Sequence, residues 1–173
     1  MAESLEQKAK LYALKAHEEV NQKYGKILPY SFHLSMVVKI ARDFIYLIAE
    51  EEKEEVLCGC WLHDVLEDTH KTYNDILKEL GETCAEYSYA LANEKGRTRK
   101  ERANEKYYLG IKFYKNSTFI KLCDRIANSN FSKNCGNSSM FEKYQKEYDF
   151  MRSILYDVRY EDLWKELEKT LFK

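Results

Sequence analysis

Proline and glycine are scarce in this chain of 173 residues, which has one proline and six glycines. Tight turns between short strands depend on such residues, so a multi-stranded sheet is disfavoured and long helices are expected. No apolar run approaches the roughly 20 residues that span a bilayer. The net charge of −1 gives no overall field to attract or exclude nucleic acid. An apolar content of 45% indicates a globular chain.

Cysteine is present five times, an odd number, and without the spacing of a zinc finger. Cys58 and Cys60 form a C-x-C pair that would diverge on a helix. This usage favours free thiols in a reducing cytosol. Residues 1–6 are acidic and polar, unlike a secretory signal. We therefore expect a soluble, cytoplasmic protein.

The spacing of apolar residues predicts a series of helices and no strand of useful length. Thr72 resembles an N-cap with an acidic residue three positions later, and Gly81 is placed to end the same helix. The predicted fold is all-α, a single domain over residues 1–173 with about eight to ten helices. The expected helices cover residues 3–22, 31–48, a segment from about 50 through His63 and Asp64, 72–81, 82–92, 102–113, 118–128, 140–156 and 160–171.

The most informative segment covers residues 56–69, an apolar stretch that carries one histidine and three carboxylates at its C-terminal end. Buried ionisable groups are costly unless they are paired or bind a metal. On a continuous helix, His63 would share a face with Glu67, and Asp64 would share the adjoining face with Asp68. The segment is therefore predicted to present metal ligands and a proton-transfer group to one cleft.

Two further residues complete a candidate ligand set. His33 lies near the start of the second predicted helix, and Asp124 lies in another apolar context. Two imidazoles and two carboxylates suit Mn, Fe, Co, Ni or Zn better than Ca or Mg. Each residue taken alone also has a structural explanation. His33 could be a core histidine, and Asp124 could pair with Arg125 or Lys121.

Three segments resemble the HD-domain phosphohydrolase superfamily. Residues 28–33, L-P-Y-S-F-H, are similar to its P-Y-x-x-H, and residues 62–69, L-H-D-V-L-E-D-T, to L-L-H-D-x-x-E-D-T. Residues 121–128, K-L-C-D-R-I-A-N, are similar to K-L-A-D-R-x-x-N. The resemblance is greatest to the hydrolase domains of RelA/SpoT alarmone enzymes and to the small alarmone hydrolases. It is strongest over residues 8–130 and implies an HD-domain helical bundle closed by residues 137–173.

The resemblance implies one metal, usually manganese, on His33, His63, Asp64 and Asp124. It implies hydrolysis that removes pyrophosphate from the 3′ position of guanosine tetra- or pentaphosphate. Activation or orientation of the water falls on Glu67 and Asp68, and Asn128 is placed near the nucleotide. The expected partner is a small nucleotide, with a homodimer possible and with no nucleic acid or membrane.

The chain also departs from the family pattern. The family often has an Arg-Lys pair before P-Y-x-x-H that holds the base and phosphates, whereas residues 21–26 offer only Lys23 and Lys26. Arginine and lysine are not equivalent in stacking or in bidentate phosphate contacts. The family's threonine–aspartate step reads A-N-E at residues 92–94. These departures bear on specificity for guanine and leave the ligand set intact.

A basic stretch over residues 95–102 has two interpretations. It is either a phosphate clamp or a solvated charged loop, and its candidate phosphate-binding residues are Arg97, Arg99, Lys100 and Arg102. The substrate also has alternatives, namely a nucleoside monophosphate, a nucleoside triphosphate or an NADPH-type dinucleotide. A non-catalytic module that binds a nucleotide or a metal is the alternative from another class.

Overall fold

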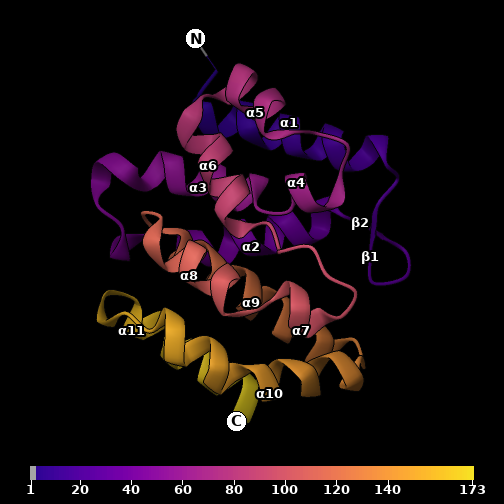
Figure 1. The fold of residues 1–173 in the computed structure, drawn as a ribbon, viewed down its shortest axis with the longest axis vertical. Helices are drawn as coiled ribbons and strands as arrows, with labels where there is room; N and C mark the ends of the chain where they lie inside the picture. The colour runs from indigo at the N-terminus through magenta and orange to yellow at the C-terminus, as the bar shows by residue number, and fades with distance from the viewer. Residues whose placement is uncertain (1–2) are drawn as a thin grey trace.

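Helices dominate the computed structural model, which describes residues 3–173 (Figure 1). The predicted all-α fold is confirmed. Nine helices in this range have eight residues or more. They are α1 (Leu5–Glu19), α2 (Ser31–Asp43), α3 (Lys53–Leu62), α5 (Tyr73–Leu80), α6 (Glu82–Leu91), α8 (Glu105–Phe113), α9 (Ser117–Asn134), α10 (Ser138–Leu155) and α11 (Glu161–Phe172). Short turns of helix complete the set: α4 (Val65–Asp68), α7 (Arg99–Arg102) and 3-10 turns at Ile45–Leu47, Glu50–Glu52 and Val158–Tyr160.

Helices α3 and α9 form the centre of the bundle. Helix α3 packs against α1, α2, α6 and α9, and every residue from Val56 to Leu62 is buried. This explains why that segment is apolar on all sides, because a helix surrounded by others has no solvent face. Helix α9 packs against α2, α10 and α11 and links the two ends of the molecule, with α1 and α5 at one end and α10 and α11 at the other (Figure 1).

Several predicted boundaries are confirmed. Thr72 caps α5 in a reciprocal capping box with Asp75, and Gly81 ends the helix with a φ of 90°. Such a φ is easily adopted by glycine and strained for most other residues. The helix predicted from residue 82 also begins there, as α6.

Other helix ends differ from the prediction. Helix α2 ends at Asp43 and not near residue 48, and a 3-10 turn follows. The helix expected from residue 102 begins at Glu105, because the side chain of Asn104 accepts a hydrogen bond from the Tyr107 N–H. Helix α9 continues to Asn134, six residues beyond the predicted end.

The helix was predicted to run through His63 and Asp64, and this prediction is wrong. Helix α3 ends at Leu62, both residues lie in a turn, and α4 begins at Val65. The Nδ1 of His63 donates to the carbonyl of Cys60 at 2.8 Å, the oxygen that the amide of Asp64 would otherwise use. The helix is therefore interrupted between His63 and Glu67.

Two strands of two residues each, β1 (Lys23–Tyr24) and β2 (Leu28–Pro29), form a small antiparallel hairpin before α2. The five cysteines are free thiols, four of them buried, as expected. Among the described residues, no helix combines the length and the apolar character that a membrane span requires.

Candidate metal centre

Four side chains from three separate segments converge at the middle of the bundle. His33 comes from α2, His63 and Asp64 from the turn after α3, and Asp124 from α9. The Nε2 atoms of the two histidines are 3.2 Å apart. An oxygen of Asp64 lies 3.4 Å from His33 Nε2 and 2.9 Å from His63 Nε2. An oxygen of Asp124 lies 3.3 Å from His33 Nε2 and 3.6 Å from His63 Nε2. The four predicted ligand residues thus meet in space.

The imidazoles are oriented for ligation. The hydrogen bond from His63 Nδ1 to the Cys60 carbonyl keeps a proton on Nδ1, so Nε2, which faces the cluster, is the nitrogen that a metal would bind in exchange for its proton. His33 is 1% exposed, and its Nε2 also faces the cluster while its Nδ1 has no hydrogen-bond partner within residues 3–173. Two facing Nε2 atoms among carboxylates are the arrangement that a cation would bridge.

The carboxylates are held by groups around them. The hydroxyl of Tyr30 donates to Asp64 at 2.5 Å. Asp124 accepts from Lys121 Nζ at 2.9 Å and from the side-chain amide of Asn128 at 2.6 Å. Partners of this kind fix the orientation of ligating carboxylates and are part of a functioning metal site.

Burial and charge act in opposite directions at these carboxylates. Burial alone would raise the pKa of Asp124, but Lys121 and the hydrogen bonds from the histidines hold that pKa well below its usual range. The pKa of Asp64 is also held low, against the effect of burial, chiefly by the charge of His63. Both groups therefore remain ionised at neutral pH, the form in which carboxylates bind metals.

This donor set fits a divalent metal. It combines two imidazole nitrogens with two carboxylate oxygens, a mixture that suits Mn, Fe, Co, Ni or Zn. One ligand atom each from His33, His63 and Asp64 lies within 4.8 Å of the others, as a common ion requires. Four protein ligands would leave positions for water and for a substrate oxygen on a six-coordinate ion.

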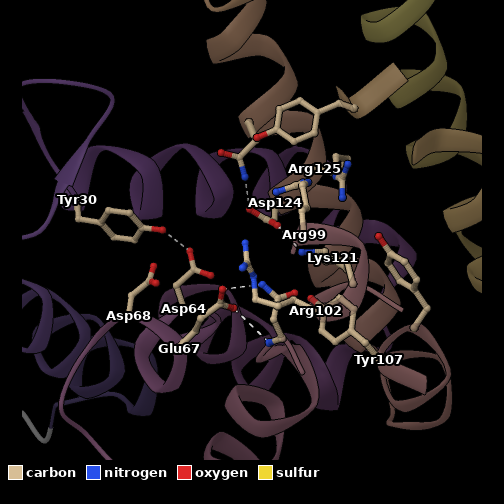
Figure 2. Close-up of a pocket in the computed structure, with 15 residues that line it drawn as sticks. Tyr30, Asp64, Glu67, Asp68, Arg99, Arg102, Tyr107, Lys121, Asp124 and Arg125 are labelled. Carbon is tan, nitrogen blue, oxygen red and sulfur yellow. Dashed lines mark hydrogen bonds and ion pairs between the residues drawn. The ribbon is translucent and has the colours of Figure 1, made fainter. Parts of the chain in front are cut away.

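A cavity of about 210 Å³ opens beside the two ligand carboxylates (Figure 2). One part of its wall is acidic and another is basic. Its lining comprises Tyr30, Asp64, Glu67, Asp68, Asn93, Arg99, Arg102, Ala103, Tyr107, Tyr108, Lys121, Asp124, Arg125, Asn128 and Tyr144. Its basic part is suited to an anionic group, and its acidic part lies at the candidate metal centre.

Glu67 and Asp68 lie in the wall beside Asp64 (Figure 2). Glu67 accepts hydrogen bonds from the backbone N–H of Asn93 at 3.2 Å and from its side-chain amide at 2.6 Å. Asp68 accepts one from Gln22 at 2.8 Å. The pKa of each carboxyl is raised, first by desolvation and then by the charge of Asp64. A raised pKa makes a carboxylate a better proton acceptor.

The basic wall is assembled from α7 and α9. Arg99 and Arg125 both bind the carboxylate of Glu147 in α10, with nitrogen–oxygen distances of 2.5 and 2.6 Å. Arg125 also lies over the ring of Tyr144, 4.8 Å from its centroid. One carboxylate shared between two guanidinium groups leaves a net positive charge, and Arg102 adds a further cation to the lining.

The structure divides the predicted substrate-binding residues into two groups. Asn128, Arg99 and Arg102 line the cavity. The other four, Lys23, Lys26, Arg97 and Lys100, are exposed and are not among its lining residues within 3–173. The basic stretch is thus part cavity wall and part solvated loop, because α7 turns only some of its side chains inward.

Sequence reasoning missed several residues of the site. Tyr30 stands in the P-Y-x-x-H segment, and Lys121 and Arg125 flank Asp124, so a closer reading of these motifs could have found them. Glu147 carries no comparable signal. It lies in a charged stretch of α10, far along the chain from Arg99 and Arg125.

Comparisons with known proteins bear on the fold. No protein-family model matches the chain, and no curated protein matches it either. A solved structure of a metazoan orthologue of SpoT, described as hydrolysing ppGpp and as having a role in starvation responses, is similar with a TM-score of 0.71. The two share 21% sequence identity, and the match covers 98% of this chain and 96% of that chain. The chain therefore has the fold of that protein.

Proposed function

We propose that this protein is a metal-dependent phosphohydrolase that acts on a nucleotide, and that its substrate is guanosine 3′,5′-bis(diphosphate). The observation that carries the proposal is the convergence of His33, His63, Asp64 and Asp124 beside a cavity with a basic wall. The match to a structure described as a ppGpp hydrolase supports the choice of substrate. The reaction consumes water, removes pyrophosphate from the 3′ position and leaves guanosine 5′-diphosphate.

The four ligand residues would hold one divalent metal, proposed to be manganese. A bound metal of this kind lowers the pKa of coordinated water and polarises a phosphoryl oxygen. Tyr30, Lys121 and Asn128 keep the ligand carboxylates in place through the hydrogen bonds described above. The ligand geometry would then be ready before the substrate enters.

Glu67 and Asp68 are assigned the activation and orientation of the attacking water. Glu67 accepts its proton as a general base, and Asp68 orients it toward the phosphorus. Asn93 donates to both oxygens of Glu67, which fixes the carboxylate in the cavity wall. The charge of Asp64 raises the pKa of both carboxyl groups, which favours proton uptake by them.

The basic wall is assigned to the phosphates. Arg99, Arg102 and Arg125 would bind the oxygens of the leaving pyrophosphate and of the 5′-diphosphate. Glu147 holds two of these guanidinium groups in place before the substrate binds, which lowers the cost of reorganisation. Positively charged groups at fixed positions stabilise the negative charge that develops on the leaving group.

One observation favours a different nucleotide as the substrate. The loop that precedes α2 places neither Lys23 nor Lys26 in the cavity lining, and its Tyr24 donates to Asn128 at 2.7 Å. The part of the site that would read the base therefore differs from the family pattern. A nucleoside monophosphate, a nucleoside triphosphate and NADPH are the alternatives to test.

The decisive experiment measures pyrophosphate release from guanosine tetraphosphate by metal-stripped protein reloaded with Mn²⁺. Asp64→Ala removes one ligand, so we expect both manganese content and turnover to be lost. Asp149→Ala is the matched control, because it removes the same charge at an exposed position in α10. It should behave like the wild type.

The other outcomes are equally informative. Turnover of another nucleotide in the panel, abolished by Asp64→Ala, would keep the phosphohydrolase and replace its substrate. Tight nucleotide binding by the manganese-loaded protein without turnover of any substrate would contradict the enzyme and favour a binding module.

A further inference from the structure

The end of α1 brings His17 and Gln22 together. The backbone N–H of Gln22 donates to the carbonyl of His17 at 3.1 Å, and that of Asn21 donates to Glu18 at 2.9 Å. Asn21 has a φ of 50°. These features define a Schellman motif, in which the chain reverses through one left-handed residue. The motif sets the two side chains beside each other, at a distance that allows a direct hydrogen bond.

The two side chains form a hydrogen-bonded chain that ends at Asp68. His17 Nδ1 is 2.7 Å from the side-chain oxygen of Gln22, and the side-chain nitrogen of Gln22 donates to Asp68 Oδ2 at 2.8 Å. His17 is 2% exposed, so this chain is shielded from water on the histidine side. Asp68 is the only member of the chain that lines the catalytic cavity within the described residues.

The chemistry of the three groups fixes the direction of these bonds. An ionised carboxylate only accepts, so the amide nitrogen of Gln22 must face Asp68 and its oxygen must face His17. That oxygen also only accepts, so His17 must carry a proton on Nδ1. The bond to Asp68 uses Oδ2, which leaves Oδ1 for a ligand in the cavity.

His17 also supports a metal ligand through a second contact. Its ring stacks on that of Tyr30, with centroids 4.4 Å apart and an interplanar angle of 24°. The hydroxyl of Tyr30 donates to Asp64. One buried histidine therefore stands behind both Asp68 and the ligand Asp64.

We propose that His17 and Gln22 are positioning residues, which hold the carboxylate of Asp68 in the orientation needed to direct the attacking water. The inference rests on the proposed hydrolysis at this site. Neither residue belongs to the three motifs, and neither lines the cavity within the described residues. Both would act through Asp68. Their loss should lower the rate of the chemical step and leave metal binding in place.

The test compares two variants that break the chain at different links. Gln22→Glu keeps an acceptor for His17 but places a carboxylate against Asp68. His17→Phe keeps an aromatic ring on Tyr30 and removes the Nδ1 proton. We expect each to lower kcat about 10- to 100-fold, since small misplacements of a reacting group have effects of this size. KM and the manganese content should stay within about twofold of the wild type.

Asn21→Asp is the matched control. It adds the same charge as Gln22→Glu one residue away, at an exposed position where aspartate tolerates the left-handed backbone. Wild-type kcat in both Gln22→Glu and His17→Phe would overturn the proposal. Loss of manganese together with kcat in both variants would also overturn it, because the residues would then support the ligands and not the water.

A second measurement needs no turnover. Nitrogen-15 NMR of histidine-labelled, Zn²⁺-loaded protein reports which ring nitrogen of His17 carries the proton, and the absence of that signal in His17→Phe assigns it. We expect the proton on Nδ1. A proton on Nε2 would contradict the hydrogen-bonded chain itself. Inactivity of the wild type toward every nucleotide, with the proton on Nδ1, would contradict the proposed function and keep the geometry.

Discussion

At the scale of single residues, the site depends on acidic groups with different environments. Asp64 and Asp124 have pKa values held low by cationic neighbours, whereas the pKa values of Glu67 and Asp68 are raised by desolvation and by Asp64. The first pair suits a permanent metal ligand and the second a proton acceptor. Residues of one chemical type thus receive different roles from their surroundings.

Replacement of Glu67 by glutamine tests whether this carboxyl group is a proton acceptor and not a metal ligand. Glu67→Gln keeps the size of the side chain and removes the carboxylate that would accept the proton. We expect kcat to fall about 10²- to 10⁴-fold, the usual contribution of a general base. Manganese content, measured by atomic emission on the same sample, should equal that of the wild type. Full turnover by this variant would remove Glu67 from its assigned role.

At the scale of elements, the contact between α3 and its neighbours positions the turn with His63 and Asp64. Gly59 lies in the middle of α3, and a Cβ at this position would lie 2.5 Å from Ile120 in α9 and 3.0 Å from Tyr87 in α6. Both neighbours are fully buried. The close approach of three helices therefore requires a residue without a side chain here.

Gly59→Ala should accordingly be destabilising although alanine is the better helix former. We expect the free energy of unfolding to fall by about 1–3 kcal/mol, the usual cost of overpacking, as measured by urea denaturation. Gly110→Ala is the control, because Gly110 lies in α8 and a Cβ there would have no neighbour within 4 Å. That variant should gain up to about 1 kcal/mol from helix propensity. Equal effects at the two positions would contradict the packing argument.

Helices α7, α9 and α10 are joined by one carboxylate. Glu147 of α10 binds Arg99 of α7 and Arg125 of α9. Burial alone would raise the pKa of Glu147, but the two guanidinium groups lower it below its usual value of 4.5. A carboxyl with a lowered pKa in the folded state adds stability above its unfolded pKa, and this contribution is lost as the pH falls through its folded pKa.

Glu147→Gln should therefore destabilise the protein in a pH-dependent way. At pH 7 we expect a loss of about 1–3 kcal/mol, the range for hydrogen bonds to charged groups. The difference from the wild type should shrink as the pH is lowered from 4.5 through the lower folded-state pKa of Glu147, because Glu147 itself is then protonated. Urea denaturation of both proteins at several pH values measures this difference in the free energy of unfolding. A difference that stays constant over this range would show that the charge of Glu147 is not responsible.

At the scale of the whole molecule, the proposed metal centre links segments that are distant in sequence. His33 of α2, the turn after α3 and Asp124 of α9 come together only when the bundle is folded. A ligand that binds only the folded state raises its stability. A metal ion bound there should therefore also link these segments and stabilise the folded state.

Manganese should raise the midpoint of thermal unfolding, Tm. At a free Mn²⁺ concentration of 100 times the dissociation constant, the free energy of unfolding should rise by about 2.7 kcal/mol. For a chain of this size that corresponds to about 5–10 °C. Differential scanning fluorimetry of metal-stripped protein with and without Mn²⁺ measures the shift, and Asp64→Ala should show none. An equal shift in that variant would place the stabilising ion elsewhere.

The sequence alone determined the helical content, several helix caps and the identity of the four candidate ligands. These features depend on local spacing, on capping residues such as Thr72, and on motifs within single segments. Only the tertiary structure decided that Arg99 enters the cavity while Arg97 does not, and that Gln22 holds Asp68. Those outcomes depend on contacts between residues far apart along the chain, which no local pattern of side chains specifies.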